Sequence, residues 1–117
     1  MAITDFGTTN TGQLVQKITL SNGDLTVGIL TLGAIVQSVR LAGVAHDLTL
    51  GADRVADYQG DMRYHGSIIG PVANRVTGAQ AMIAGRAHRF DDNEGRNCLH
   101  SGAAGLHLKL WEIAAAT

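Results

Sequence analysis

Apolar and polar residues alternate along the first third of the chain, which is the period of a β-strand that is buried on one face. The alternation runs through 17–20 and again through 25–29, and the polar segment 21–24 separates the two runs. This segment contains Asn22-Gly23, and Asn-Gly between alternating apolar residues is a strong β-hairpin signal because both central residues of its turn take positive φ. The pattern predicts a hairpin over 13–31, preceded by a loose arm or edge strand at 1–12.

A third strand is predicted after the turn at Gly33-Ala34. Its apolar residues Ile35, Val39 and Leu41 are predicted to share one face. Ser38 and Arg40 are predicted on the opposite face. A short strand at 46–50 is predicted to follow it, with Leu48 and Leu50 facing inward.

The second half of the chain alternates less regularly. Weak alternation predicts a second hairpin over 79–84 and 86–91, with its turn at Ala84-Gly85, and a strand over 106–113 that carries Trp111. Trp111 is expected in the core, because a lone tryptophan in a strand is more often packed than exposed to a ligand.

Residues 51–66 lose the apolar period and are rich in charged and aromatic polar side chains. This polar composition predicts a surface loop with one helical turn at 54–58. Glycines punctuate the rest so closely that no glycine-free stretch between Gly12 and Gly105 exceeds ten residues, which favours short strands over helices. The chain is therefore predicted to be all-β.

The composition fits one globular domain with an aliphatic core, since 45% of the 117 residues are hydrophobic and only 4% are aromatic. Nine basic and ten acidic residues leave a net charge of −1, which argues against nucleic acid or an acidic membrane as a partner. No apolar run approaches the roughly 18 residues that span a bilayer. A single cysteine, Cys98, and the lack of a signal-like N-terminus indicate a cytoplasmic location.

No metal site is predicted, because the five histidines form no His-x-x-x-His pair and have no cysteine at a metal-site spacing. Cys98 lies two residues before His100, but a cysteine nucleophile also needs a third group that orients the histidine. We interpret Cys98 as a passive thiol.

Two clusters separated by one short hairpin carry the candidate chemistry, and they are Gly70-Pro71-Val72-Ala73-Asn74-Arg75 and Asn97-Cys98-Leu99-His100-Ser101-Gly102. Arg75 offers five N–H donors in a planar fork, Asn74 offers donors and an acceptor, and His100 can donate or accept. This set matches the hydroxyls and ring oxygen of a sugar. Taken singly, each residue also has a structural interpretation, as a turn former, an ion-pair partner or a loop histidine.

These motifs resemble the aldose 1-epimerases, or galactose mutarotases. Members carry a stretch like Gly-Arg-x-Ala-Asn-Arg-Ile, then a hairpin, then Asn-x-Leu-His-Gly-Gly-x-x-Gly-Phe and a Trp a few residues on. This chain has Pro71 where many members have Arg, Ser101 for the first Gly after the histidine, and Leu106 for Phe. Trp111 follows at the matching place, and the spacing from Arg75 to His100 agrees with that of the family.

The resemblance implies an antiparallel β-sandwich of the galactose mutarotase type, of which 1–117 would be a single partial domain from the N-terminal portion. It implies an enzyme that interconverts the α and β anomers of free hexoses such as galactose and glucose, with no cofactor. Asn74, Arg75 and His100 would bind the sugar. The family's general acid, a histidine in a Thr-Asn-His-x-Tyr-Phe-Asn-Leu-like stretch, and its general base, a late glutamate, would lie beyond Thr117.

Two alternatives remain open at this point. The chain could be a non-catalytic carbohydrate-binding β-sandwich related to the mutarotases, or a generic all-β domain. A partial sandwich would also leave strand edges unpaired, so self-association or pairing with a missing C-terminal portion is expected.

Overall fold

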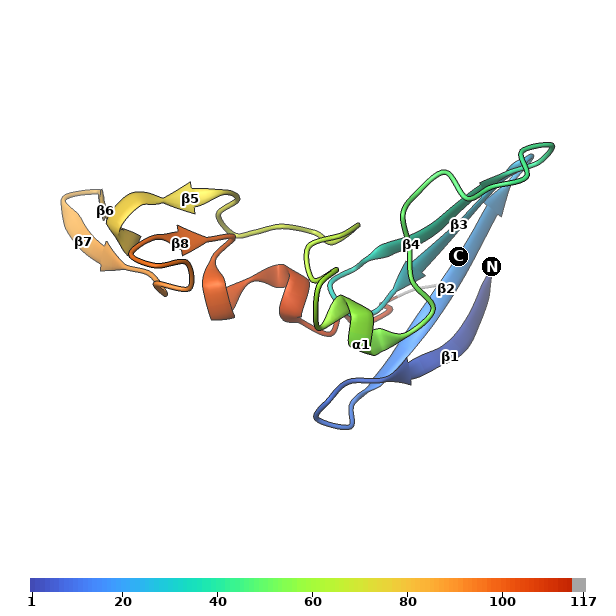
Figure 1. Ribbon diagram of the computed structural model, residues 1–117, viewed down its shortest axis with the longest axis horizontal. Coiled ribbons are helices and arrows are strands. Elements are labelled where there is room, and N and C mark those ends of the chain that lie inside the picture. The colour runs from blue at the N-terminus through green and yellow to red at the C-terminus, as the bar shows by residue number, and fades with distance from the viewer. Residues whose placement is uncertain (115–117) are drawn as a thin grey trace.

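The computed structural model describes residues 1–114 and is organised at its two ends into antiparallel strands (Figure 1). One end is a four-stranded sheet in the order β1 (Ala2–Thr8), β2 (Leu14–Asn22), β3 (Leu25–Leu30) and β4 (Val36–Leu41). The other end has two small ladders, β5 (Arg75–Val76) with β8 (Cys98–Leu99) and β6 (Gln80–Ile83) with β7 (Arg86–Arg89). The prediction of an all-β, antiparallel fold is confirmed.

The helical elements are single turns. They are α1 (Val55–Tyr58) and the 3₁₀ turns η1 (Thr77–Ala79), η2 (Gly102–Ala104) and η3 (Leu106–Leu108). The predicted helical turn at 54–58 is confirmed by α1, although its Val55 and Tyr58 are buried. No helix within residues 1–114 is long and apolar enough to cross a membrane.

The hairpin predicted over 13–31 is present as β2 and β3, and 1–12 supplies an edge strand, β1, that pairs with β2. Its turn differs from the prediction. Asn22 is paired with Leu25, so the central residues are Gly23 and Asp24, and only Gly23 has a positive φ, of 57°. The second predicted hairpin is confirmed by β6 and β7, whose central residues Ala84 and Gly85 have φ of 50° and 74°.

The face predicted for the third strand is confirmed for Ile35, which is 1% exposed and in the core, but not for Leu41. A β-bulge, which was not predicted, shifts the register of β3 and β4. Gly28 pairs with Ser38 whereas Ile29 pairs with Val36, which leaves Gln37 as the extra residue. Gln37 is buried and donates from Nε2 to the carbonyl of Ala52, while Leu41 is 38% exposed.

The strand predicted at 46–50 was also wrong. This segment is a loop held by the carboxylate of Asp47, which accepts hydrogen bonds from Ser38 Oγ and from the backbone N–H groups of Val39 and Thr49. Leu48 and Leu50 are 50% and 70% exposed rather than buried. The one backbone hydrogen bond from this segment to β4, from the N–H of Leu48 to the carbonyl of Val39 at 2.8 Å, does not extend into a ladder.

The third error concerns 106–113, which forms η3 and an irregular tail instead of a strand. Its one sheet-like contact is a bridge between Leu110 and Leu32. Trp111 is 41% exposed, so it is not a core residue within the described chain. The buried residue of this segment is His107, which is only 5% exposed.

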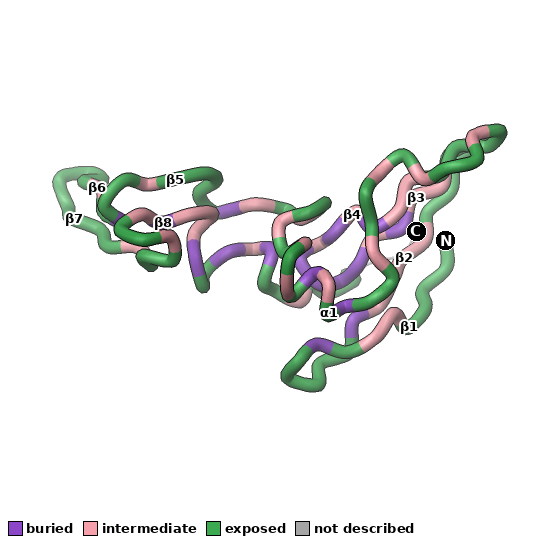
Figure 2. The backbone as a smooth tube through the Cα atoms, in the orientation of Figure 1, coloured by how far each residue is buried: buried purple, intermediate pink, exposed green. Residues whose placement is uncertain are grey.

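The hydrophobic core lies at the four-stranded end (Figure 2) and comprises Val15, Leu30, Leu32, Ile35, Val55 and Tyr58. The molecule is elongated, with extents of 52 × 30 × 29 Å and a radius of gyration of 16.6 Å, where a compact domain of this length has about 13 Å. Its accessible surface is 7589 Å², against roughly 6,100 Å² for a compact monomer of the same mass. Much of the chain thus lies outside a closed core.

Candidate functional site

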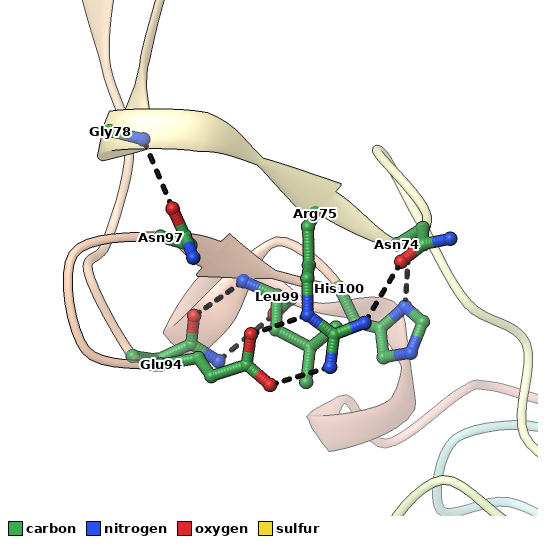
Figure 3. Close-up of polar contacts among 8 residues, drawn as sticks. Asn74, Arg75, Gly78, Glu94, Asn97, Leu99 and His100 are labelled. Atoms are coloured by element: carbon green, nitrogen blue, oxygen red, sulfur yellow. Dashed lines mark hydrogen bonds and ion pairs between the residues drawn. The ribbon is translucent and has the colours of Figure 1, made fainter.

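The candidate site is built on the β5–β8 ladder, where Arg75 pairs with Leu99 (Figure 3). The side-chain amide of Asn93 holds Leu99 on its other edge, since Nδ2 donates to the Leu99 carbonyl at 2.9 Å and the Leu99 N–H donates to Oδ1 at 2.7 Å. Asn97 accepts from the N–H of Gly78 at 3.2 Å. Side-chain amides therefore replace the neighbouring strands that a two-residue ladder lacks.

Asn74 joins the other two predicted site residues. Its backbone N–H donates to Nδ1 of His100 at 2.9 Å, and its carbonyl accepts from the N–H of His100 at 3.0 Å. Its side-chain Oδ1 accepts from Nη1 of Arg75 at 3.3 Å. The three residues that the sequence singled out are thus one hydrogen-bonded unit, drawn together in Figure 3.

The contact with Asn74 fixes the tautomer of His100. A nitrogen that accepts a hydrogen bond from a backbone N–H carries no proton, so the ring proton resides on Nε2. The ring donor of His100 is therefore Nε2–H, a group suited to a hydroxyl oxygen.

Arg75 makes an ion pair that sequence reasoning missed. Its Nε and Nη2 donate to the two carboxylate oxygens of Glu94 at 2.5 and 2.7 Å. The hydrogen bonds with Glu94 raise the pKa of Arg75, and those from Arg75 lower the pKa of Glu94. The contacts with Glu94 and Asn74 use three of the five N–H groups of Arg75, which leaves two uncommitted. The side chain of Arg75 is 53% exposed.

Glu94 lies outside both sequence clusters that carry the predicted site residues. The structure shows that it is aimed at Arg75 across the site. No local sequence signal marks it, because the two residues are 19 positions apart and meet only through the hairpin between them.

The backbone around the site is unusual. Asn74, His100 and Ser101 have φ of 63°, 51° and 66°, in the left-handed region that only a few per cent of non-glycine residues occupy. Ser101 ties the two clusters together, because its Oγ accepts from the N–H of Val72 at 2.8 Å and donates to its carbonyl at 3.0 Å. Strained backbone that is held in place in this way is typical of sites where side chains must be aimed.

The sequence also raised two other chemical possibilities, a reactive Cys98 and a metal site. Cys98 is 1% exposed, in keeping with a passive thiol. Within residues 1–114, no group of three or more His, Cys, Asp or Glu side chains is arranged to hold a metal ion.

Comparison with known proteins gives concordant matches. The family profile described as aldose 1-epimerase matches residues 16–117. The chain is 31% identical to galactose mutarotase from Bos taurus over 100 residues, which cover 83% of this chain and 29% of that protein. It is 35% identical to maltose epimerase from Levilactobacillus brevis over 103 residues, which cover 86% of this chain and 30% of that protein.

The comparison with solved structures also finds an aldose epimerase. Galactose 1-epimerase from Lactobacillus acidophilus matches with a TM-score of 0.78 at 25% identity, over 95% of this chain and 32% of that chain. The chain spans about 30% of the length of the curated relatives that it matches.

Proposed function

Because the chain belongs to the aldose 1-epimerase family, we propose that its Asn74, Arg75 and His100 bind a free aldohexose such as galactose or glucose. The reaction they serve interconverts the α and β anomers. A base takes the proton from the C1 hydroxyl and an acid protonates the ring oxygen, so that the ring opens, the C1–C2 bond rotates and the ring recloses.

The observation that carries this proposal is the hydrogen-bonded unit around Asn74. It joins the half-buried His100, which has an Nε2–H donor, to the exposed Arg75, which keeps two uncommitted N–H groups. A sugar offers several hydroxyl oxygens at fixed spacing, and more than one aimed donor is needed to orient it. Glu94 holds the guanidinium group of Arg75 in place and accepts hydrogen bonds from only two of its N–H groups.

The same residues supply recognition rather than proton transfer. Arg75 stays protonated, and the hydrogen bonds from Arg75 lower the pKa of Glu94, which makes this carboxylate a weak base. The family's Thr-Asn-His-like stretch does not occur in the 117 residues. We propose that the chain is a partial domain that carries the sugar-binding half of the site.

The test is a titration of the isotope-labelled chain with D-galactose, followed by amide NMR shifts. Arg75→Ala and His100→Ala should each weaken binding roughly 10- to 100-fold, the range expected for lost charge-assisted or aimed hydrogen bonds. Glu94→Gln should cause a smaller loss, because Glu94 orients Arg75 and is not proposed to touch the sugar.

Arg54→Ala is the matched control, since Arg54 is another exposed arginine with its own carboxylate partner, Asp57 at 2.8 Å. It should bind galactose like the parent chain. Failure of the parent chain to bind any free hexose, or unchanged binding in both Arg75→Ala and His100→Ala, would overturn the proposal.

A further inference from the structure

Tyr64 lies against both His100 and the buried His107. Its ring centroid is 4.8 Å from that of His100, at an interplanar angle of 62°, and 5.0 Å from that of His107, at 58°. Such tilted and edge-on arrangements are favourable for aromatic pairs. The three rings form a column that ends at the proposed sugar-binding histidine.

The segment that carries Tyr64 is anchored to the four-stranded end of the molecule. The N–H of Val36 donates to the carbonyl of Gly66 at 2.9 Å, and the N–H of Ile68 donates to the carbonyl of Gly33 at 3.0 Å. The ring of Tyr64 therefore reaches from this end to His100, which directly follows β8. The guanidinium of Arg63 covers the same ring at 5.1 Å.

His107 forms the fixed back of the column. It is 5% exposed, and its Nδ1 finds no hydrogen-bond partner among residues 1–114. Its ring fills the space beside the α-carbon of Gly105, where an added Cβ would overlap it. The buried ring of His107 therefore provides a packed surface for the ring of Tyr64.

We propose that Tyr64, backed by His107, is a positioning residue that holds the ring of His100 so that Nδ1 meets the N–H of Asn74 and Nε2–H faces the sugar. The second half of this statement rests on the proposed function. Rotation of the imidazole by half a turn would replace Nδ1 with a carbon and remove the Asn74 contact. The contact with Tyr64 holds the plane of the imidazole, and within that plane the N–H of Asn74 selects the orientation that presents Nδ1.

The contacts that matter are made by the tyrosine ring, so Tyr64→Phe should preserve them. Tyr64→Leu should not, because leucine fills a similar volume without an aromatic face or edge. Aromatic pairs of this kind correspond to roughly 3- to 10-fold in an equilibrium constant, and the affinity for D-galactose should fall by that factor in Tyr64→Leu.

The decisive readout is the imidazole ¹⁵N spectrum of His100 in the intact 117-residue chain without sugar, at pH 7.5. The parent chain and Tyr64→Phe should show one tautomer, with the proton on Nε2 and an accepting Nδ1. Tyr64→Leu should show averaged nitrogen shifts together with faster hydrogen exchange at the Asn74 amide. His65→Ala, an exposed neighbour on the same segment, is the control and should match the parent.

An unaltered His100 tautomer and Asn74 amide in a folded Tyr64→Leu chain would overturn the positioning role, whatever happens to binding. If Tyr64→Leu does not fold, loss of the single tautomer in folded Tyr64→Phe would overturn it instead, because the proposal assigns the effect to the ring. A parent chain with the single tautomer but no galactose binding would leave the positioning of His100 standing and reject the proposed function.

Discussion

Asn74 and His100 face each other at the end of the β5–β8 ladder, where the N–H of Asn74 donates to a histidine ring nitrogen instead of a strand carbonyl. The reverse bond, from the N–H of His100 to the carbonyl of Asn74, is an ordinary ladder contact. One of the two hydrogen bonds between these residues therefore has a side-chain nitrogen as its acceptor. The ladder ends by fixing the orientation of an imidazole.

This relationship separates the structural and binding roles of His100. In His100→Asn, the side-chain oxygen can occupy the place of Nδ1, and asparagine tolerates the observed φ of 51°. We expect His100→Asn to keep the Asn74 amide protected while galactose binding falls roughly tenfold or more, since Nε2–H is lost. Hydrogen exchange at Asn74 and an NMR titration measure the two effects. Parent-like binding in His100→Asn would show that Nε2–H does not contact the sugar.

Acid should destabilise the chain through His107. Burial lowers the pKa of His107, with smaller contributions from the nearby His100 and Arg63. The unfolded chain then binds more protons than the folded chain below the ordinary pKa of about 6.5, so this contribution to stability is present above that pH and is lost as the pH falls further. The urea midpoint should drop between pH 7.5 and 5.5, and the drop should shrink in His107→Phe. An equal drop in both chains would contradict this assignment.

A second acid transition should involve Asp47. Its hydrogen bonds, first from the Ser38 hydroxyl and then from the N–H groups of Val39 and Thr49, lower its pKa from 3.8 to about 2. The contribution is present above about pH 4 and is lost as the pH falls towards 2. Asp47→Asn should speed amide exchange at Val39 and Thr49 at neutral pH, whereas the exposed Asp53→Asn should not. Equal protection in Asp47→Asn would mean that the loop is held by other contacts.

The sequence predicted those parts of the fold that are encoded over a few residues. The dipeptides Asn22-Gly23 and Ala84-Gly85 each locate a hairpin to within one residue, because residues that accept positive φ between strand-like segments leave few other arrangements. The alternation around Gln37 did not reveal that the polar bulge residue Gln37 is buried like Ile35, because no local pattern marks a bulge.

The errors at 46–50 and 106–113 have one physical cause. Alternation predicts a strand only where a continuous ladder and a buried face exist. Leu48 makes one backbone hydrogen bond to Val39 of β4, and both Leu48 and Leu50 are exposed. At the site, the motif spacing pointed to Asn74, Arg75 and His100, and these three do meet. Glu94 and Tyr64 escaped notice, because their contacts join segments that come together only in three dimensions.

The exposed surface predicts self-association. The chain exposes about 1,500 Å² more than a compact monomer of its mass, and a standard interface needs roughly 800 Å² from each partner. Leu14, Leu110, Trp111 and Ile113 line one groove at the edge of the core. We expect light scattering to show a mass that rises from monomer towards dimer with concentration. Leu14→Glu should suppress the rise, and Leu50→Glu, 70% exposed on a separate loop, should not.

The last prediction is that these 117 residues do not accelerate mutarotation by themselves. A positioned acid or base typically contributes about 10²- to 10⁴-fold each, and anomer interconversion needs both, on opposite sides of the anomeric centre. Arg75 cannot act as a base, and the carboxylate of Glu94 is engaged by Arg75 at both oxygens. His100 alone could move one proton, but its Nδ1 is occupied by the N–H of Asn74.

Polarimetry on freshly dissolved α-galactose decides the point, with a complete aldose 1-epimerase as the positive control. The optical rotation should decay at the buffer rate in the presence of the chain, even at concentrations where NMR shows galactose bound. That combination would separate binding from proton transfer. Faster decay that disappears in His100→Ala but persists in Arg54→Ala would show that the acid and base both reside in this chain, and the assignment of its residues to binding alone would then be wrong.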